Sequence, residues 1–433
     1  MPDLQPFRGV RYNPLKVPDL SKVTAPPYDV IDEAARVRLA DRDEHNIVRL
    51  ILPQDGKDTD RYTCAAELLR RWLAEGVLLE DARPGIYVIR QEWQSGSRQH
   101  ERTGFIAAVG LEPFGEGKIY PHENTLSAPK EDRLRLLEAT RANLSQVFSI
   151  FPDEDATVDA WLTRATSPPA GARSVDDAGV VTSLWCEFDG TRIAGLQTLM
   201  ADRKLFIADG HHRYETALNY QRRRAEAGTA SPHGAENALM MLCVAMSNPG
   251  LVTYPTHRLL PAEGVSPDEL IEKLKAQFRV QSIATFSRET GELDAILSSD
   301  TTPNLMVLYV GKSLPPMLVW PKDPAKLRER MPVRSDVWRS LDVSILQYAV
   351  LEGMLGLTLE HVTSGAKIGY VHDADEALRR VDEGGFSAAF ILRPTPVSAV
   401  AEVASHLEKM PPKSTFFYPK AVTGMVLRRL NDG

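Results

Sequence analysis

Apolar residues recur along this chain at two different spacings, which predict a mixture of helices and strands. From Tyr62 to Trp72 the apolar positions recur at helical intervals, and Gly76 ends the pattern. Residues 85–93 and 101–111 are rich in apolar residues and flank the polar stretch QSGSRQ. This second pattern predicts two strands joined as a hairpin.

The same reasoning assigns elements to the rest of the chain. The apolar run ALMMLCVAM at residues 238–246 predicts a buried strand or a core helix. Ser266 and Glu269 have the spacing of a capping box at a helix start, and Pro129 is placed to open another helix. Further strands are predicted at residues 45–53, 145–151, 204–208, 304–311, 317–320, 386–392 and 423–430. Further helices are predicted at residues 129–143, 211–228, 266–278, 340–357, 373–385 and 396–410.

Helices and strands are mixed along the whole chain, with no internal repeat. The predicted fold class is α/β or α+β, with mixed sheets and helices packed on them. Three regions are predicted: an N-terminal α/β region at 1–200, a strand–turn–helix region at 201–260 that packs with it, and a C-terminal α/β region at 261–433.

Composition narrows the classes of protein that fit. The chain has 433 residues, 43% hydrophobic residues and a formal net charge of -7, so it has enough apolar residues for a core and no basic surplus for nucleic acid. Cys64, Cys186 and Cys243 lack the spacing of a zinc ribbon or disulfide framework, which favours a reducing, cytoplasmic setting. The longest apolar run has nine residues, whereas a spanning helix needs about 20, and no signal peptide or membrane segment is predicted. The sequence is compatible with a homo-oligomer.

The stretch LFIADGHHRYETAL, residues 205–218, is the strongest candidate for chemistry. An apolar strand reaches Asp209 and Gly210 and then runs into a helix that opens with His211, His212 and Arg213. The first N–H groups of a helix and its dipole favour an anion at that end. The planar, always-charged guanidinium of Arg213 suits phosphate or carboxylate. The pattern therefore predicts a phosphate site.

Two other interpretations of this stretch stay open. His211 and Glu215 are four residues apart and can share a helix face toward a metal, although the adjacent histidines point about 100° apart. The structural alternative is a strand-to-helix corner in which Asp209 caps the helix and Arg213 pairs with an acid.

A family resemblance rests on this stretch and on several others. IADGHHRYETA resembles the signature of the domain of unknown function 1015 family. The segments APPYDVI, HNIVRLILP, SAPKEDRLRLLEATRANLS, LDVSILQYAVLEGMLG, YVHDADEAL and MPPKSTFFYPK are similar to other blocks of that family. The resemblance spans most of the chain but implies little about function.

A second resemblance covers only about a dozen residues. GHHRYETA is similar to the corresponding strand–turn–helix of the ParB/sulfiredoxin superfamily, including the free-serine kinases, in which it binds nucleotide phosphates. Carried over by position, the resemblance implies that Gly210, His211, His212 and Arg213 contact phosphate. His211 occupies the position of the sulfiredoxin thiol, so that enzyme's thiolate chemistry is not implied here.

Two further segments carry candidate residues. In PHENTLSAPKEDRLR, Lys130 and Arg133 lie three apart and can face one phosphate, while His122 or Glu123 is placed to accept a proton. The alternative is a solvated first turn of a helix. In TAPPYDV, Asp29 follows a rigid proline pair and can act as a base or bind Mg²⁺, or simply close a turn.

Three common enzyme motifs are missing from the chain. No G-x-S-x-G elbow surrounds Ser145, no G-x-G-x-x-G follows Gly115, and Lys413 to Thr415 lack the glycines of a P-loop. The sequence analysis therefore predicts a protein that binds a small phosphate ligand and transfers a phosphoryl group to a small hydroxyl compound such as free serine. A nucleotide or pyrophosphate is the donor, with Mg²⁺ on Asp209 or Asp29 and with Glu123 or Asp29 taking the proton. The alternative is a nucleotide-responsive regulatory or binding protein without turnover.

Overall fold

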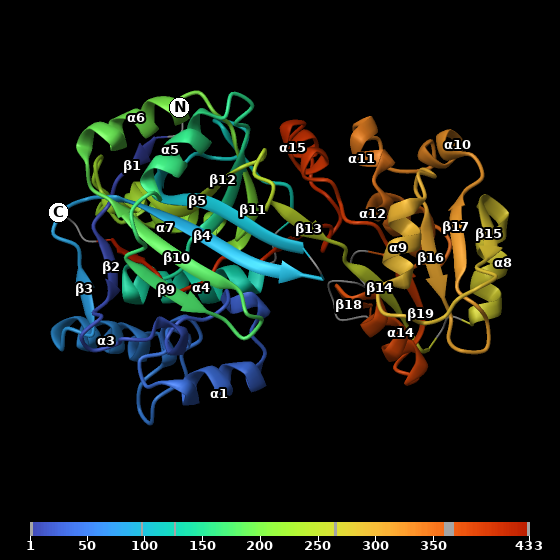
Figure 1. The fold of residues 1–433 in the computed structure, drawn as a ribbon, viewed down its shortest axis with the longest axis horizontal. Coiled ribbons are helices and arrows are strands. Elements are labelled where there is room, and N and C mark those ends of the chain that lie inside the picture. The colour runs from blue at the N-terminus through green and yellow to red at the C-terminus, as the bar shows by residue number, and fades with distance from the viewer. Residues whose placement is uncertain (1–2, 97, 125–126, 264–265, 359–367, 431–433) are drawn as a thin grey trace. The chain divides into compact units, whose positions relative to one another are not determined.

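The computed structural model describes residues 3–96, 98–124, 127–263, 266–358 and 368–430 (Figure 1). The chain forms two compact units. The first unit contains the described residues of three segments, 3–121, 127–251 and 419–430. The second contains His122–Asn124 and Val252–Tyr418. The end of the chain thus returns to the first unit.

The described residues of the first unit include a nine-stranded mixed sheet (Figure 1). Its strands occur in the order β6 (Ile119–Tyr120), β11 (Leu205–Asp209), β8 (Val147–Phe151), β12 (Ala238–Ala245), β5 (Arg98–Gly110), β4 (Ile86–Ser95), β10 (Val181–Glu187) and β9 (Ala172–Val175), with β1 (Leu4–Gln5) paired to β5. β12 is parallel to β8 and antiparallel to β5, and the predicted β4–β5 hairpin is confirmed. The predicted class of mixed sheets is therefore confirmed.

The main core of this unit forms where helices cover the sheet. All eight residues of β12 are buried, which decides between the two predicted states of that run. α5 (Thr157–Ala165) and α6 (Gly190–Met200) lie together and bury Trp161 and Leu196 against the strands (Figure 1). α7 (His211–Glu226) contributes Tyr214 and Ala217 to the same core, which fixes the helix that follows β11.

A second core of the first unit surrounds a smaller sheet. Its strands are β3 (Leu78–Glu80), β2 (Gly9–Tyr12), β21 (Leu427–Arg429) and β7 (Ala142–Asn143), in that order. The neighbouring helical elements are η1 (Leu20–Lys22), η2 (Tyr28–Val30), α1 (Glu33–Arg42), α2 (Val48–Ile51), α3 (Arg61–Ala74), α4 (Ser127–Thr140) and η3 (Ala235–Asn237). α4 begins two residues before the predicted Pro129 start and packs against both α3 and α7. This packing brings α4 beside the predicted phosphate motif.

The strand predicted at residues 45–53 is wrong, because residues Val48–Ile51 form the short helix α2. The Asn46 side chain accepts a hydrogen bond from the Val48 N–H at 2.9 Å and donates one to the Lys22 carbonyl at 2.7 Å. The Ile47 N–H donates to the Val23 carbonyl at 2.8 Å. The composition of this apolar run favours a strand, but its hydrogen bonds to residues 22 and 23 hold it as a short helix instead.

The second unit is built on a six-stranded sheet within its described residues. The strand order is β15 (Phe278–Ser282), β17 (Met317–Pro321), β16 (Met306–Tyr309), β19 (Phe386–Ile391), β14 (His257–Pro261) and β18 (Gly369–Val371), and β13 (Val252–Tyr254) pairs separately with β20 (Phe416–Tyr418). Its helices are α8 (Pro267–Gln277), α9 (Glu292–Ser299), α10 (Pro324–Arg328), α11 (Asp336–Ser340), α12 (Asp342–Ile345), the π-helical η4 (Leu346–Glu352), α14 (Ala374–Asp382) and α15 (Val397–Ser405).

The helix predicted at 266–278 is confirmed as α8, but its capping box is not formed. Ser266 occupies the N-cap position without a side-chain hydrogen bond to the helix, and Pro267 opens the first turn. Proline needs no N–H partner at that position, so the helix start does not depend on the Ser266 hydroxyl. In the described part of the chain, no helix combines the length and the apolar content needed to cross a membrane.

Candidate functional site

The predicted strand–turn–helix forms as β11, Gly210 and α7. Gly210 has φ 92°, a left-handed conformation that glycine adopts without strain. A Cβ atom at this position would lie 2.9 Å from Nε and Nη2 of Arg213. Gly210 therefore serves two purposes, because it turns the chain and leaves room for the Arg213 guanidinium to fold back over the turn.

Arg213 is held by several hydrogen bonds of its guanidinium group. Its Nη2 donates to Asp209 Oδ2 at 2.8 Å, and its Nη1 donates to the Gln146 carbonyl and to Ser145 Oγ, the latter at 3.3 Å. The side chain is 9% exposed. The acid pairing of the structural alternative is thus present, but Asp209 does not cap α7, because Gly210 is the N-cap and provides no side-chain hydrogen bond.

Asp209 pairs with a second cation that lies far away in the sequence. Lys420 Nζ donates to Asp209 Oδ1 at 2.8 Å, so each carboxylate oxygen accepts from a charged donor. Burial alone raises the pKa of Asp209, but the charges of Lys420 and Arg213 more than offset this effect and hold that pKa well below its usual value. Asp209 is therefore an anion at neutral pH.

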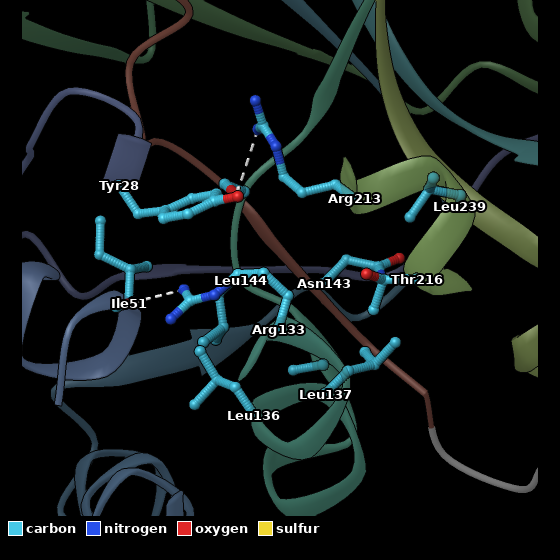
Figure 2. Close-up of a pocket in the computed structure, with 12 residues that line it drawn as sticks. Tyr28, Ile51, Arg133, Leu136, Leu137, Asn143, Leu144, Arg213, Thr216 and Leu239 are labelled. Carbon is cyan, nitrogen blue, oxygen red and sulfur yellow. Dashed lines mark hydrogen bonds between the residues drawn. The ribbon is translucent and has the colours of Figure 1, made fainter. Parts of the chain in front are cut away.

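A small cavity of about 60 Å³ opens beside the first turns of α7. Arg133, Leu136 and Leu137 of α4 line it, together with Arg213 and Thr216 of α7. Its other lining residues are Tyr28, Ile51, Ala142, Asn143, Leu144, Ser145 and Leu239 (Figure 2). The walls are mainly apolar, and a few polar groups converge on them, which is the usual character of a small-ligand site.

Two polar atoms of the residues that line this cavity are buried and lack a hydrogen-bond partner among the described residues. They are Nε of Arg213 and Oγ1 of Thr216. Thr216 as a whole is 3% exposed. A buried donor without an acceptor costs about 1–3 kcal/mol, so groups of this kind are rare unless a ligand, ion or water completes them.

Arg133 and Tyr28 form another wall of the cavity. Arg133 donates to the Ile51 carbonyl at 2.6 Å, and its guanidinium carbon lies 4.3 Å from the centroid of the Tyr28 ring. Figure 2 shows the Tyr28 ring between the guanidinium groups of Arg133 and Arg213. Burial raises the pKa of Tyr28, and the charges of the two arginines partly counteract this rise. The phenol is therefore a neutral hydrogen-bonding group.

The sequence profile of one protein family, described as "Protein of unknown function (DUF1015)", matches residues 4–344. The chain belongs to this family. The family predicted from the quoted segments is thereby confirmed. No curated protein matches the sequence of this DUF1015 protein.

Three solved structures that are similar to this DUF1015 protein match it over most of their length, but with low identity and low TM-scores. A conserved hypothetical protein from Pyrococcus furiosus has 13% identity and a TM-score of 0.33, covering 69% of this chain and 87% of its own. A free serine kinase in complex with AMP has 13% identity and a TM-score of 0.34, covering 70% and 86%. SbnI with a C-terminal truncation, from Staphylococcus aureus, has 10% identity and a TM-score of 0.34, covering 73% and 85%. At these TM-scores the overlaps decide neither the ligand nor the reaction.

The other predicted residues of α4 and α7 have separate environments in this DUF1015 protein. Lys130, predicted to act with Arg133, instead donates to Glu215 Oε2 at 2.8 Å. His211 is 4% exposed and His212 is half-buried. No group of three or more His, Cys, Asp or Glu side chains within the described ranges is arranged to hold a metal ion. The metal alternative for His211 and Glu215 therefore has no third ligand in this part of the chain.

The predicted proton acceptors Asp29, Glu123 and His122 do not line the cavity. Asp29 is exposed, whereas its neighbour Tyr28 points to the cavity. Glu123 belongs to the second unit, where its Oε1 accepts from the Lys413 N–H at 3.4 Å. His122 lies in the same unit, 3.0 Å from Thr415 Oγ1. The structure thus groups two predicted segments, around residues 122 and 413, with each other.

The sequence analysis did not identify Thr216 or the partner of Lys420. Thr216 follows Arg213 by one helical turn, and that spacing is a signal that the sequence offers for a shared face. Lys420 ends the quoted segment MPPKSTFFYPK, and its pairing with Asp209 joins residues 211 positions apart. No local pattern encodes such a contact.

Proposed function

We propose that this protein binds a phosphate-bearing ligand, a nucleotide or pyrophosphate, in the cavity between α4 and α7, and transfers a phosphoryl group to a small hydroxyl compound such as free serine. The observation that carries the binding is the pair of buried donors without acceptors, Arg213 Nε and Thr216 Oγ1, among the residues of the cavity wall. A ligand that accepts from both removes two desolvation penalties of about 1–3 kcal/mol each.

The donors favour an anion over a neutral ligand. Arg133 and Arg213 keep their charges at any physiological pH, and α7 begins beside the cavity without a side-chain cap. A volume of about 60 Å³ is on the scale of a few water molecules, so it takes a phosphate group while the rest of a nucleotide extends outward.

Phosphoryl transfer is supported by the resemblance of residues 210–213 to the free-serine kinases. In this reaction the acceptor hydroxyl oxygen bonds to phosphorus, the bond from phosphorus to the donor's bridging oxygen breaks, and the hydroxyl proton passes to a carboxylate. Asp29, which follows the cavity residue Tyr28 in the same unit, is the proposed proton acceptor. Each oxygen of Asp209 accepts a hydrogen bond from a cation, so a Mg²⁺ ion bound to Asp209 would have to displace Arg213 or Lys420. Phosphate binding as proposed requires no Mg²⁺.

One observation favours the second candidate, a nucleotide-responsive binding protein without turnover. Asp209, the acid of the motif, is held by Arg213 and Lys420 and has a lowered pKa. A carboxylate in that state is a weak base. The two candidates share the cavity and differ in whether product forms.

The test is a thermal-shift panel with ATP, ADP, CTP and pyrophosphate, each with and without Mg²⁺. We expect at least one ligand to raise the melting temperature of the wild type, because a ligand that binds the native state stabilises it. Phosphorus NMR with serine and other small alcohols then detects transfer. Stabilisation without any phosphorylated alcohol would favour the binding protein, and no stabilisation by any phosphate would reject the site.

Thr216→Val is the sharpest variant, because valine keeps the shape and removes the donor. We expect the ligand-free protein to gain about 1 kcal/mol of stability, and the ligand affinity to fall about fivefold. Thr166→Val is the matched control. Thr166 is 8% exposed, and its hydroxyl accepts from Arg90 at 2.9 Å and donates to the Leu162 carbonyl at 3.0 Å. The control should lose stability and keep its ligand affinity.

A further inference from the structure

Asp209 joins two cations that come from different parts of the chain. Arg213 lies one helical turn after it, and Lys420 lies in the segment that returns to the first unit. Both ion pairs measure 2.8 Å. The side chains of Arg213, Asp209 and Lys420 are 9%, 14% and 16% exposed, so water screens these charges only weakly.

The backbone around Lys420 is fixed independently of this ion pair. The Lys420 carbonyl accepts from Gln91 Nε2 at 3.0 Å, and the Pro419 carbonyl accepts from Arg102 Nη2 at 2.5 Å. Gln91 and Arg102 are 2% and 1% exposed. The lysine ammonium can therefore change partners by side-chain rotation while the chain that carries it stays in place.

Arg213 is likewise held in place by contacts other than its bond to Asp209. Its Nη1 donates to the Gln146 carbonyl, and its Cα is part of α7. Losing the Asp209 contact would leave the guanidinium charge at the cavity wall, because Arg213 lines the cavity. A phosphate group with two or more negative charges is a stronger partner for these two cations than one carboxylate.

We propose that Asp209 stands in for the ligand: it holds Arg213 and Lys420 at the start of α7 until a phosphate replaces it as their partner. Lys420 is then a third cation of the phosphate site, with Arg133 and Arg213, and Asp209 competes with the ligand. This inference rests on the proposed phosphate binding. It makes the acid of the motif an antagonist of binding, the opposite of its predicted role as a metal ligand.

Calorimetric titration with inorganic pyrophosphate in metal-free buffer tests the exchange. Asp209→Asn removes the competing charge and should bind pyrophosphate about fivefold more tightly than the wild type. Lys420→Met should bind it about tenfold more weakly, and Lys420→Arg should restore affinity to within about twofold of the wild type. A merely structural role for Lys420 would not give this recovery together with tighter binding by Asp209→Asn.

The ion pair between Lys118 and Asp202, near the start of β11, serves as the control. Lys118 Nζ pairs with Asp202 Oδ1 at 2.9 Å, and β6 pairs with β11 at Leu205. Asp202→Asn and Lys118→Met change the net charge by the same amounts and should leave the affinity unchanged. Equal shifts in these controls would overturn the exchange and indicate a general charge effect.

The outcomes separate the two proposals. If the wild type and every variant fail to bind pyrophosphate and the nucleotides, both proposals are rejected. If the wild type binds but Asp209→Asn binds no more tightly, the exchange is rejected and the phosphate site stands. If Asp209→Asn does not fold, as judged by circular dichroism, the Lys420 variants decide: unchanged affinity of Lys420→Met overturns the exchange.

Discussion

Arg258 of the second unit and Arg213 of the first both have side chains that are little exposed, but they are held in different ways. Arg258 of the second unit is 2% exposed and donates to the carbonyls of Thr256, Pro412 and Lys413, the latter two at 3.1 and 3.0 Å. Burial lowers the pKa of Arg258 to about 10. Arg213 of the first unit divides its bonds between a carboxylate, a hydroxyl and a carbonyl, and its Nε has no acceptor among the described residues.

The difference shows what distinguishes a structural arginine from a candidate binding one. Arg258 ties three loop carbonyls together and is not among the residues that line the cavity beside α7. Arg213 lines a cavity and shares it with another unsatisfied donor, Thr216. Burial by itself therefore does not indicate function. A buried donor without a protein acceptor beside a cavity marks a candidate binding site, because a ligand, ion or water has to complete its hydrogen bond.

The largest effect is expected when Arg258 is replaced, and it is a loss of stability. Arg258→Met keeps an apolar stem but removes every donor, leaving the three carbonyls without it, and should lower the free energy of unfolding by about 4 kcal/mol. Its pyrophosphate affinity should not change. Arg213→Met should lose less stability and about a hundredfold in affinity. Urea unfolding and calorimetric titration measure both quantities, and a loss of affinity in Arg258→Met would contradict the distinction.

A smaller effect is expected at the turn that makes room for Arg213. Gly210→Ala places a Cβ 2.9 Å from the guanidinium in a left-handed conformation, and should cost about 2 kcal/mol together with about tenfold in pyrophosphate affinity. Gly76→Ala is the control, because Gly76 has φ 68° and its Cβ would meet nothing within 4 Å. That variant should lose about 1 kcal/mol and no affinity. Equal losses of affinity in both variants would show that Arg213 is not displaced.

The smallest effect separates the two units by pH. Burial, with the charge of Arg258, lowers the pKa of His257 to about 3. Below the unfolded pKa of about 6.5, the unfolded state binds a proton that the folded state refuses, so stability falls as pH drops, by up to about 1.4 kcal/mol per pH unit. Asp209 of the first unit has a lowered pKa, so its ion pairs contribute fully to stability until the pH falls below about 4, the pKa of an aspartate in the unfolded chain.

Acidification from pH 7 to 5.5 should therefore weaken the second unit before the first. Scanning calorimetry follows the two units, and His257→Asn should remove much of the slope, since asparagine does not titrate and retains an acceptor for the Leu392 N–H. A first unit that loses stability sooner, or a slope that is unchanged in His257→Asn, would refute this assignment.

Local pattern was enough to predict many individual elements. Helical spacing of apolar residues predicted α3 and α7, and continuous apolar runs predicted β8, β11 and β16. Segment 45–53 shows the limit of this reasoning, because Asn46 and Ile47 bond to carbonyls of residues 22 and 23 and turn the chain into α2. Propensity is a weak guide where distant backbone groups offer better partners.

Only part of the candidate site could be predicted from the sequence, because the rest depends on contacts between distant segments. Asp209, Gly210 and Arg213 are contiguous, so their chemistry is visible in one short stretch of sequence. Arg133 was predicted to act with Lys130, yet packing of α4 on α7 brings Arg133 to the cavity while Lys130 pairs with Glu215. Asp29 keeps its predicted role as a proposal, although it does not line the cavity, and Glu123 belongs to the second unit.

The sequence by itself determined the strand–turn–helix, because a glycine at a left-handed turn and an adjacent arginine are local features with local physical causes. It also determined the family. Only the tertiary structure decided that Thr216 lacks a partner, that the Tyr28 ring lies beside Arg133, and that Lys420 returns to Asp209. Hydrogen-bond satisfaction and ion pairing depend on which distant segments meet, and packing of the apolar residues in the core of the first unit decides which segments do.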